Sequence, residues 1–526
     1  MSFIFGVDDG PMAIAEHLEI ETKFDVDNAL GMPVLTGLPG VVDVAGPTEQ
    51  QLDATYFDTA DLALAAARVT LRRRTGGEDA GWHLKLPLAE QARREVRAPL
   101  GERDGEGDGY EGVPAELLAS VRVLIRDHGL TAVATLGTRR LVHRLLGENG
   151  VVLAEVCDDR VTAIVPGDAV RADSWREWEV ELVDGSMELL GAAGNALTEA
   201  GATVASHESK LVRSLGPAAP PATPMSFDLP ARPSAAEVLI TYLQNQIADM
   251  RRLDPGFRAD DPEALHDLRV AVRRLRSALA TYKTLLEDGS VDELRDELNW
   301  LGGTLGQARD AEVLRAELQQ AVAAEPAELV LGSVAVRIDD DLSTTYQQGR
   351  RDALAALDET RYFRLLDRLD ALVAAPPVSA LGGKPALKVI PTLVAEDWRR
   401  LRRLARRAES VTDEADRDRA LHEVRKAAKR LRYAAEAAHP LIGRKAARLA
   451  TSAKNLQTIL GDHHDTVVIR DLLRRLAVEA QLAGDSSFTY GRLHALAQAR
   501  ASKADVRYRN AWAGFPEPRI ARWSAV

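Results

Sequence analysis

The chain changes its hydrophobic periodicity at a segment rich in proline and alanine, residues 216–233. Before this segment, short runs alternate apolar and polar residues between turns that contain Gly, Asp or Pro, a pattern typical of antiparallel strands. After it, long segments rich in Ala, Leu, Arg and Glu repeat apolar residues at helical spacing. A chain of 526 residues also exceeds what one hydrophobic core usually organises. We therefore predict an α+β multidomain protein with a β domain at 1–215, a linker at 216–233 and an all-helical domain at 234–526.

The composition narrows the class of protein. The chain contains one cysteine, Cys157, so it can form no internal disulfide and suits a reducing compartment. It has neither an apolar run long enough to span a membrane nor an N-terminal secretory signal. The net charge of −12 argues against general nucleic-acid binding, so a polyanion-binding site would need basic residues concentrated on particular faces. We expect a cytoplasmic protein with no membrane partner and no specific nucleic-acid partner.

The helical half contains an internal repeat. The segment 265–276 recurs at 421–432, and the LGxxxD motif at 305–310 is echoed at 460–465. The two offsets are nearly equal, at about 155 positions. Two motifs repeated at one offset predict a duplicated helical unit with internal pseudo-symmetry.

Charged residues in the first half alternate with apolar ones at the period of a strand, so each set shares one face. The opposite faces are apolar and need a core, which favours a closed barrel with the charges inside over a sandwich with the charges in water. Clustered carboxylates need a divalent cation, and hard oxygen ligands prefer Mg²⁺ or Mn²⁺. Clustered bases need an anion with several charges, and metal plus polyanion is the usual arrangement for phosphoryl transfer. The sets are Glu19, Glu21 and Lys23; Arg72 and Arg74; Lys85; Arg93, Glu95 and Arg97; and Glu177, Glu179 and Glu181.

In this order, together with the run Tyr56-Phe57-Asp58-Thr59, these motifs resemble the CYTH superfamily, the triphosphate tunnel metalloenzymes, over about residues 15–215. The resemblance implies an antiparallel, eight-stranded β tunnel barrel. It also implies a metal-dependent enzyme that hydrolyses inorganic triphosphate, thiamine triphosphate or RNA 5′-triphosphates, or that cyclises ATP.

The resemblance also implies roles for individual residues. The catalytic set is Glu19, Glu21, Lys23, Arg72, Arg74 and Lys85. The metal ligands are Glu19, Glu21, Asp158, Glu179 and Glu181, and phosphate is bound by Lys23, Arg72, Arg74, Lys85, Arg93 and Arg139. Asp159 is an alternative to Asp158, Arg140 is an alternative to Arg139, and Glu177 is expected to assist the carboxylates. Lys210 either contacts phosphate or ends a helix, whereas Arg73, Arg94 and Arg97 are expected to face outward and Cys157 to belong to the core.

Two matched basic stripes characterise the helical half. At helical spacing, His266, Arg269, Arg273 and Arg276 lie beside a core stripe, and His422, Arg425, Lys429 and Arg432 repeat them. A single stripe of this kind is usually a solvated face, but its recurrence in both copies favours a polyanion-binding surface. Arg399, Arg402 and Arg406 form a weaker third stripe. For His463 and His464, a structural role at a helix–loop junction is favoured over metal binding.

The stripes and the two LGxxxD motifs resemble the CHAD domain, a helical domain often fused behind a CYTH barrel, over about residues 234–515. This resemblance implies a helical bundle that binds inorganic polyphosphate and associates with polyphosphate granules. The whole sequence thus predicts a metal-dependent triphosphatase, active on inorganic triphosphate or a related short polyphosphate, fused to a polyphosphate-binding domain. The alternatives are a non-catalytic polyphosphate-binding or targeting protein and a class IV-type adenylate cyclase.

Overall fold

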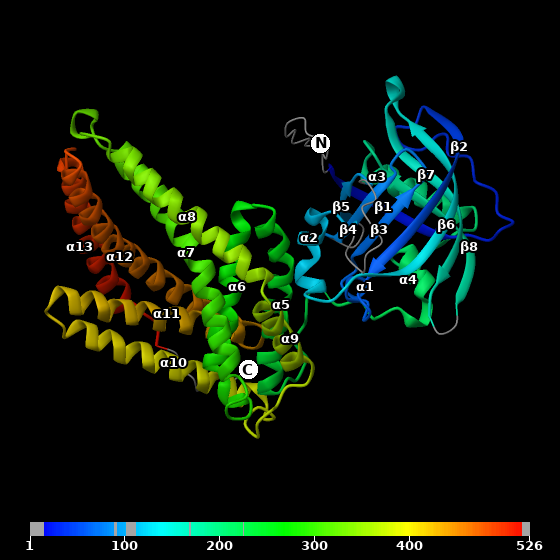
Figure 1. The fold of residues 1–526 in the computed structure, drawn as a ribbon. Coiled ribbons are helices and arrows are strands. Elements are labelled where there is room, and N and C mark those ends of the chain that lie inside the picture. The colour runs from blue at the N-terminus through cyan, green and yellow to red at the C-terminus, as the bar shows by residue number, and fades with distance from the viewer. Residues whose placement is uncertain (1–14, 89–91, 101–111, 168–169, 225, 518–526) are drawn as a thin grey trace. The chain divides into compact units, whose positions relative to one another are not determined.

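The protein folds into two compact units, residues 1–224 and 225–526, in a computed structural model (Figure 1). The boundary lies within the segment 216–233 that the sequence predicts as a linker. The structure describes residues 15–88, 92–100, 112–167, 170–224 and 226–517. The two ends of the predicted domains, 1–14 and 518–526, therefore lie outside the described residues. Each unit is considered by itself below.

The first unit is built on a closed ring of eight antiparallel strands, as the sequence predicts. Neighbouring strands pair in the order β5-β4-β3-β2-β6-β7-β8-β1, and pairing of β1 with β5 closes the ring. A short ninth strand, β9 (Thr203–Val204), pairs with the end of β1. The eight strands are β1 (Ala15–Asp25), β2 (Asp43–Asp58), β3 (Thr70–Thr75), β4 (Gly81–Pro87), β5 (Ala92–Ala98), β6 (Thr131–Leu146), β7 (Val152–Val165) and β8 (Arg171–Leu182).

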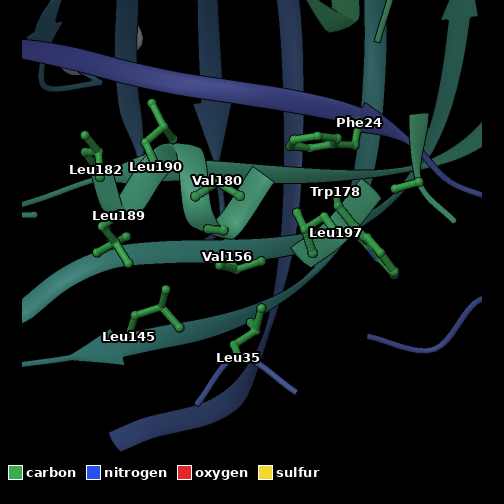
Figure 2. Packing of buried hydrophobic residues seen from close by; sticks show 13 residues of the cluster. Phe24, Leu35, Leu145, Val156, Trp178, Val180, Leu182, Leu189, Leu190 and Leu197 are labelled. Atoms are coloured by element: carbon green, nitrogen blue, oxygen red, sulfur yellow. The ribbon is translucent and has the colours of Figure 1, made fainter. Parts of the chain in front are cut away.

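Three helices cover the outer face of the barrel with apolar side chains. Helix α3 (Met187–Glu199), whose first turn is capped by Ser186, buries Leu189, Leu190 and Leu197 against Trp178 and Val180 of β8 and other strand residues (Figure 2). Helices α1 (Ala63–Ala66) and α2 (Ala115–Ile125) contribute to a second cluster over β3, β4 and β5. Because the apolar residues of each strand point into these clusters, the alternate, charged residues point into the barrel.

One end of the barrel interior is filled by apolar side chains. Helix α4 (Lys210–Leu215) brings Leu211 and Leu215 against Tyr56, Leu136 and Trp175, and a 3₁₀ turn, Gly216–Ala218, follows it. These strand residues lie on the same inward faces as the charged ones, further along each strand. The barrel is therefore closed at this end, which we call its floor, and is not an open tunnel.

The second unit is entirely helical. Its helices are α5 (Ala235–Arg258), α6 (Pro262–Thr281), α7 (Asp292–Ala323), α8 (Val334–Asp358), α9 (Thr360–Ala374), α10 (Ala386–Glu409), α11 (Glu414–Ile442), α12 (Arg444–Leu482) and α13 (Phe488–Ala513), with 3₁₀ turns at Lys283–Leu285 and Ala327–Leu329. Helix α5 opens with the capping box of Ser234 and Glu237. None of the helices among the described residues is both long and apolar enough to cross a membrane.

The internal repeat appears as two similar series of helices. Consecutive helices pack together from α5 to α8 and again from α10 to α13, and the series meet where α6 packs on α11 and α5 on α10. The basic stripes lie on α6 and α11, each of which begins at an aspartate cap, Asp261 and Asp413. The LGxxxD motifs lie on α7 and α12. The ends of α7, α8, α12 and α13 share one apolar cluster, so the two repeats form a single body.

Candidate functional site

The inward faces of the barrel strands enclose a strongly charged cavity of about 230 Å³. Its lining includes nine basic and eight acidic residues. The bases are Lys23, Arg72, Arg74, Lys85, Arg93, Arg97, Arg140, Arg144 and Lys210, and the acids are Glu19, Glu21, Glu78, Asp79, Glu95, Glu155, Glu179 and Glu181. Nine predicted site residues are thus brought together by strand alternation: Glu19, Glu21, Lys23, Arg72, Arg74, Lys85, Arg93, Glu179 and Glu181.

Two predicted site residues, Asp158 and Arg139, face away from the cavity, and this corrects their assignment. Asp158 accepts two hydrogen bonds from Arg176, at 2.8 and 2.7 Å, on the outer face. Arg139 is exposed and donates two hydrogen bonds of 2.8 Å to Glu49. Both residues lie on the face of their strand opposite to the charged interior.

Their sequence neighbours, Asp159 and Arg140, occupy the interior instead. Arg140 donates hydrogen bonds of 2.7 and 2.6 Å to the two carboxylate oxygens of Asp159 and also contacts Glu179 at 2.5 Å. Asp159 is fully buried. The alternatives that the sequence left open are therefore decided by which face of β6 and β7 turns inward.

Arg97 is a further correction, because it was expected to face outward. It lines the cavity beside Arg93 and Glu95, and its Nε and Nη2 donate to Glu95 at 2.7 and 2.5 Å. Arg94, by contrast, lies on the other face of β5 near Glu16, at 3.4 Å. The alternation along β5 gives Arg97 the same face as Arg93.

Lys210 lies where the cavity meets its floor. Its Nζ is 3.0 Å from Asp159, 2.7 Å from Glu177 and 2.6 Å from Glu179. Burial alone would lower the pKa of Lys210, but these carboxylates outweigh burial and hold that pKa well above its ordinary value. Ser209 caps α4 by accepting a hydrogen bond from the backbone N–H of Val212, at 3.2 Å, which fixes the lysine at the first turn. Lys210 is therefore part of the charged site, not only a helix-end residue.

A buried carboxylate, Glu95, organises the basic wall. Besides Arg97, it lies 2.9 Å from Nδ1 of His83, 3.9 Å from Lys85 and 4.0 Å from Arg72. Burial would raise the pKa of Glu95, but the surrounding bases, Lys85 first, lower it well below its ordinary value. Tyr56 accepts a hydrogen bond from Arg72 at 3.3 Å. The bases are thus held in fixed positions by groups of the protein.

The acidic side of the cavity offers oxygen ligands suited to a divalent cation. Glu21 and Glu181 lie opposite each other on β1 and β8. Glu19 is buried; one of its oxygens contacts Lys85, and within the described chain the other has no hydrogen-bond partner. A second group, Asp159, Glu177 and Glu179, has oxygens within 4.8 Å of one another, but Lys210 already lies among them. Lysines also contact Glu19 and Glu21, so both groups of carboxylates are candidates to hold a metal, and among the described residues only the second has three oxygens this close together.

Several cavity residues were not identified from the sequence, namely Arg144, Glu155, Glu78 and Asp79. Arg144 donates to Glu155 at 2.9 Å, and the alternation 140, 142, 144 on β6 could have revealed the first of them. Glu78 and Asp79 lie between β3 and β4, where no periodicity applies. Cys157, expected in an apolar core, is buried on the inward face near Arg140 and Glu179, and its burial raises the pKa of its thiol.

In the helical unit, the two basic stripes converge on one cluster at the α6–α11 contact. Arg269 and Arg273 of α6 interact electrostatically with Arg425 and Lys429 of α11. Asp310 accepts hydrogen bonds from Arg269 at 2.7 and 3.1 Å. Burial and the three arginines lower the pKa of Lys429 to about 7. Asp310 and Asp465 offset part of the positive charge of these four bases, so a net positive charge remains for an anion.

The glycines of the LGxxxD motifs make room for two of these arginines. A Cβ added at Gly306 would lie 3.2 Å from Arg269 Nη2, and one added at Gly461 would lie 3.5 Å from Arg425 Nη2. The repeat thus places one arginine of each copy against the backbone of the next helix.

The arginines at the ends of the two basic stripes form hydrogen bonds within the protein, so they contribute less uncompensated positive charge. Arg276 donates to Asn299, whereas Arg432 donates to Glu436 at 2.7 Å and to Gln457 at 3.3 Å. His266 is half-buried on α6, and His422 stacks on His464 with ring centroids 4.5 Å apart.

The prediction that His463 and His464 lie at a helix–loop junction is wrong, because α12 continues through both residues. His463 is buried with its Nε2 3.4 Å from Asp418. His464 therefore belongs to the basic cluster through its contact with His422, while His463 contacts Asp418, one turn before His422 on α11.

Comparison with known proteins gives matches to both units. A family model described as the CYTH domain matches residues 17–215, and one described as the CHAD domain matches residues 241–474. An uncharacterised protein of Mycobacterium tuberculosis strain H37Rv is 42% identical over 496 residues, which cover 91% of this chain and 93% of the relative. Among solved structures, PptA from Streptomyces chartreusis is 21% identical with a TM-score of 0.47, covering 53% of this chain and 99% of that one. The CHAD domain from the plant Ricinus communis is 27% identical with a TM-score of 0.43, covering 56% and 99%.

Proposed function

Because the chain belongs to the CYTH family through its first unit and to the CHAD family through its second, we propose that it is a metal-dependent triphosphatase that also binds inorganic polyphosphate. The barrel would hydrolyse inorganic triphosphate or a short polyphosphate. The cavity charge is the observation that carries this proposal.

The nine bases and eight acids that line the cavity leave about one net positive charge, and the buried Asp159 and Glu177, which contact Lys210, reduce that charge further. This is too little for an anion with four or five charges, so the residues alone do not balance a triphosphate. A divalent cation held by Glu19, Glu21 and Glu181 would add two positive charges and match the anion better. The same oxygen ligands suit Mg²⁺ or Mn²⁺ and disfavour softer metals.

The basic residues would bind the phosphate chain and hold it in line for attack. Lys23, Arg72 and Lys85 project from three different strands, so together they can contact oxygens on more than one phosphate. Glu95 and Tyr56 hold Arg72 and Lys85 in place before substrate arrives, which reduces the reorganisation needed in the transition state. A bound divalent cation would supply concentrated positive charge to the phosphate oxygens where negative charge develops.

The cavity favours an inorganic chain over a nucleotide. Its apolar lining side chains are Leu52 and Val142, with Tyr56 as the aromatic contributor. A purine ring would need more apolar surface than these side chains offer. This supports the triphosphatase over an adenylate cyclase.

The helical unit would bind polyphosphate at the cluster of Arg269, Arg273, Arg425 and Lys429. The support is geometric, because two helices from different repeats bring four basic side chains together on a fixed frame. Each guanidinium can donate two parallel hydrogen bonds to one phosphate, whereas Lys429 acts as a point charge.

The test is a phosphate-release assay of the full chain with Mg²⁺ and with Mn²⁺, on triphosphate, thiamine triphosphate, ATP and polyphosphate. Glu21→Gln should lower kcat for triphosphate by at least about a hundredfold, roughly 3 kcal/mol of transition-state stabilisation, without unfolding the barrel. Glu16→Gln is the matched control, because Glu16 is an exposed residue of the same strand. If the wild-type chain releases no phosphate from any of these compounds, the non-catalytic polyphosphate-binding alternative holds.

A further inference from the structure

The outer face of α10 presents five arginines to solvent. Arg399, Arg400, Arg403, Arg406 and Arg407 are all exposed, and they form the α10 arginine stripe. The predicted third stripe is revised accordingly. Arg402 is not part of it, because its guanidinium lies over Trp398 at 4.6 Å and 3.4 Å from Glu517.

These five neighbouring arginines are all unpaired, whereas many other arginines of the helical unit form ion pairs. No hydrogen bond or ion pair joins their side chains to any other group in the part of the chain that the structure describes. Elsewhere in the helical unit, exposed or partly exposed arginines contact acids, as Arg315 does Asp339, Arg368 does Glu293 and Arg475 does Asp341. Concentrated, unpaired positive charge is unexpected on a chain with a net charge of −12.

The stripe costs the helix stability. Arg399 and Arg403, and Arg403 and Arg407, are four residues apart, and each such pair of like charges destabilises a helix by about 0.2–0.5 kcal/mol. The helix dipole favours Arg406 and Arg407 in the last turn but not Arg399, Arg400 and Arg403, which lie further back. The fold therefore does not explain the charge at Arg399, Arg400 and Arg403, whereas the binding of an anionic ligand would explain it.

The stripe adjoins the basic cluster of the repeats. Helix α10 packs on α11, and Arg400 interacts electrostatically with Glu423, the residue that follows His422 of the second basic stripe. From Arg399 to Arg407 the stripe runs roughly 12 Å along the helix. A linear anion that leaves the cluster past His422 can therefore continue along α10.

We propose that the α10 arginine stripe is an outer binding surface for inorganic polyphosphate chains that are longer than the α6–α11 cluster can hold. This inference rests on the proposed polyphosphate binding of the helical unit. All five cations are arginines, whose planar guanidinium matches phosphate oxygens better than lysine does. Single-stranded nucleic acid is disfavoured, because base stacking needs exposed aromatic rings and the one aromatic residue of α10, Trp398, is buried under Arg402.

The test compares two triple variants of the full chain that remove the same charge. Arg399→Gln/Arg403→Gln/Arg406→Gln changes the stripe, and Arg315→Gln/Arg368→Gln/Arg475→Gln changes exposed or partly exposed arginines of α7, α9 and α12. Each variant is titrated with triphosphate, short polyphosphate, long polyphosphate and single-stranded RNA at several salt concentrations.

For the stripe variant we expect long-chain affinity at low salt to fall by about tenfold, and the slope of log affinity against log salt to decrease by roughly two. Short-chain binding and triphosphate hydrolysis should be unchanged in both variants. Equal behaviour of the two variants, equal losses for short and long chains, or a loss confined to RNA would each overturn the inference.

A third variant separates this inference from the proposed function. Arg273→Gln/Lys429→Gln should weaken binding of all chain lengths if the α6–α11 cluster is the main site. If this variant binds normally while the stripe variant does not, the central site is wrong and the stripe itself is the binding surface. A wild-type chain that binds no long polyphosphate would overturn both.

Discussion

At the scale of single residues, Lys429 occupies in the second repeat the position that Arg273 occupies in the first. The substitution keeps the charge but replaces a group that never loses its proton with one that can. Burial first, and then Arg425, Arg273 and Arg269, lower the pKa of Lys429 to about 7, while Asp310 opposes this shift. His422 and His464 also face the cluster, and burial lowers the pKa of each of them.

We therefore predict that polyphosphate affinity rises as pH falls through about 7, because the bound anion favours the protonated lysine. Lys429→Arg should remove most of this dependence while preserving binding at low pH. Without ligand, the unfolded chain holds this proton up to the ordinary pKa of 10.5, so the free energy of unfolding should rise with pH between about 7 and 10.5. Titrations with long polyphosphate between pH 6 and about 8.5 check the first statement. A pH profile unchanged in Lys429→Arg would contradict it.

Arg139 and Arg140 offer an internal comparison, because they are adjacent and face opposite sides of β6. Arg140→Gln should lower triphosphate turnover by about a hundredfold and the free energy of unfolding by about 3 kcal/mol, since it leaves Asp159 and Glu179 buried without this partner. Arg139→Gln removes an exposed ion pair and should change stability by less than about 0.5 kcal/mol. Steady-state kinetics and urea unfolding of both variants test this. Similar turnover in the two variants would show that Arg140 is not part of the site.

Arg139 and Arg140 also show which inward-facing residues could be predicted from the sequence and which could not. Alternation predicted the inward position of Glu19, Glu21 and Lys23 because an uncharged residue separates each charged one. In Arg139-Arg140 and Asp158-Asp159 both faces carry the same kind of charge, so a one-residue shift of register leaves the pattern unchanged. Only the pairing of β6 with β7, which sets Arg140 opposite Asp159, decides which residue of each pair is inside.

At the scale of elements, α7 and α8 approach each other closely at Gly349. A Cβ added there would lie 2.7 Å from the backbone nitrogen of Ala308, so one helix would have to move. Gly303, on the exposed side of α7, has nothing within 4 Å of an added Cβ.

We predict that Gly349→Ala destabilises the helical unit by about 1–3 kcal/mol, because overpacking exceeds the gain in helix propensity. Gly303→Ala should stabilise it by up to about 1 kcal/mol. Thermal unfolding of the two variants, followed by circular dichroism, measures both changes. Stabilisation by both substitutions would mean that the α7–α8 contact can relax.

Helical periodicity predicted the elements of the second half better than the local composition did. The core and basic stripes placed α6 and α11 correctly. The segment Gly-Asp-His-His-Asp at 461–465 has the composition of a turn, yet it lies in the middle of α12. Arg425 packs against Gly461, a tertiary contact that propensity cannot reveal.

At the scale of the whole molecule, each unit has apolar clusters of its own. We therefore predict that residues 1–224 fold alone and keep the metal-dependent triphosphatase activity of the full chain within a few-fold. We also expect the variant Arg273→Gln/Lys429→Gln of the full chain to hydrolyse triphosphate at the wild-type rate. Phosphate release by the fragment, with its secondary structure checked by circular dichroism, is the measurement. A folded fragment without activity would mean that the helical unit takes part in catalysis.

The closed floor of the barrel would restrict how substrate enters and products leave in a triphosphatase with this fold. Leu211, Leu215 and Trp175 close the end beyond Lys210, so a phosphate chain can enter only with its terminus first and cannot be threaded through. A phosphate cleaved at the inner end is then trapped behind the remaining chain, and both must leave by the way they came in. Such an enzyme has to release its polymer after every cut, so it would shorten long chains distributively, one encounter at a time. If the helical unit binds the polymer as proposed, the released end would stay at a high local concentration and could enter the barrel again.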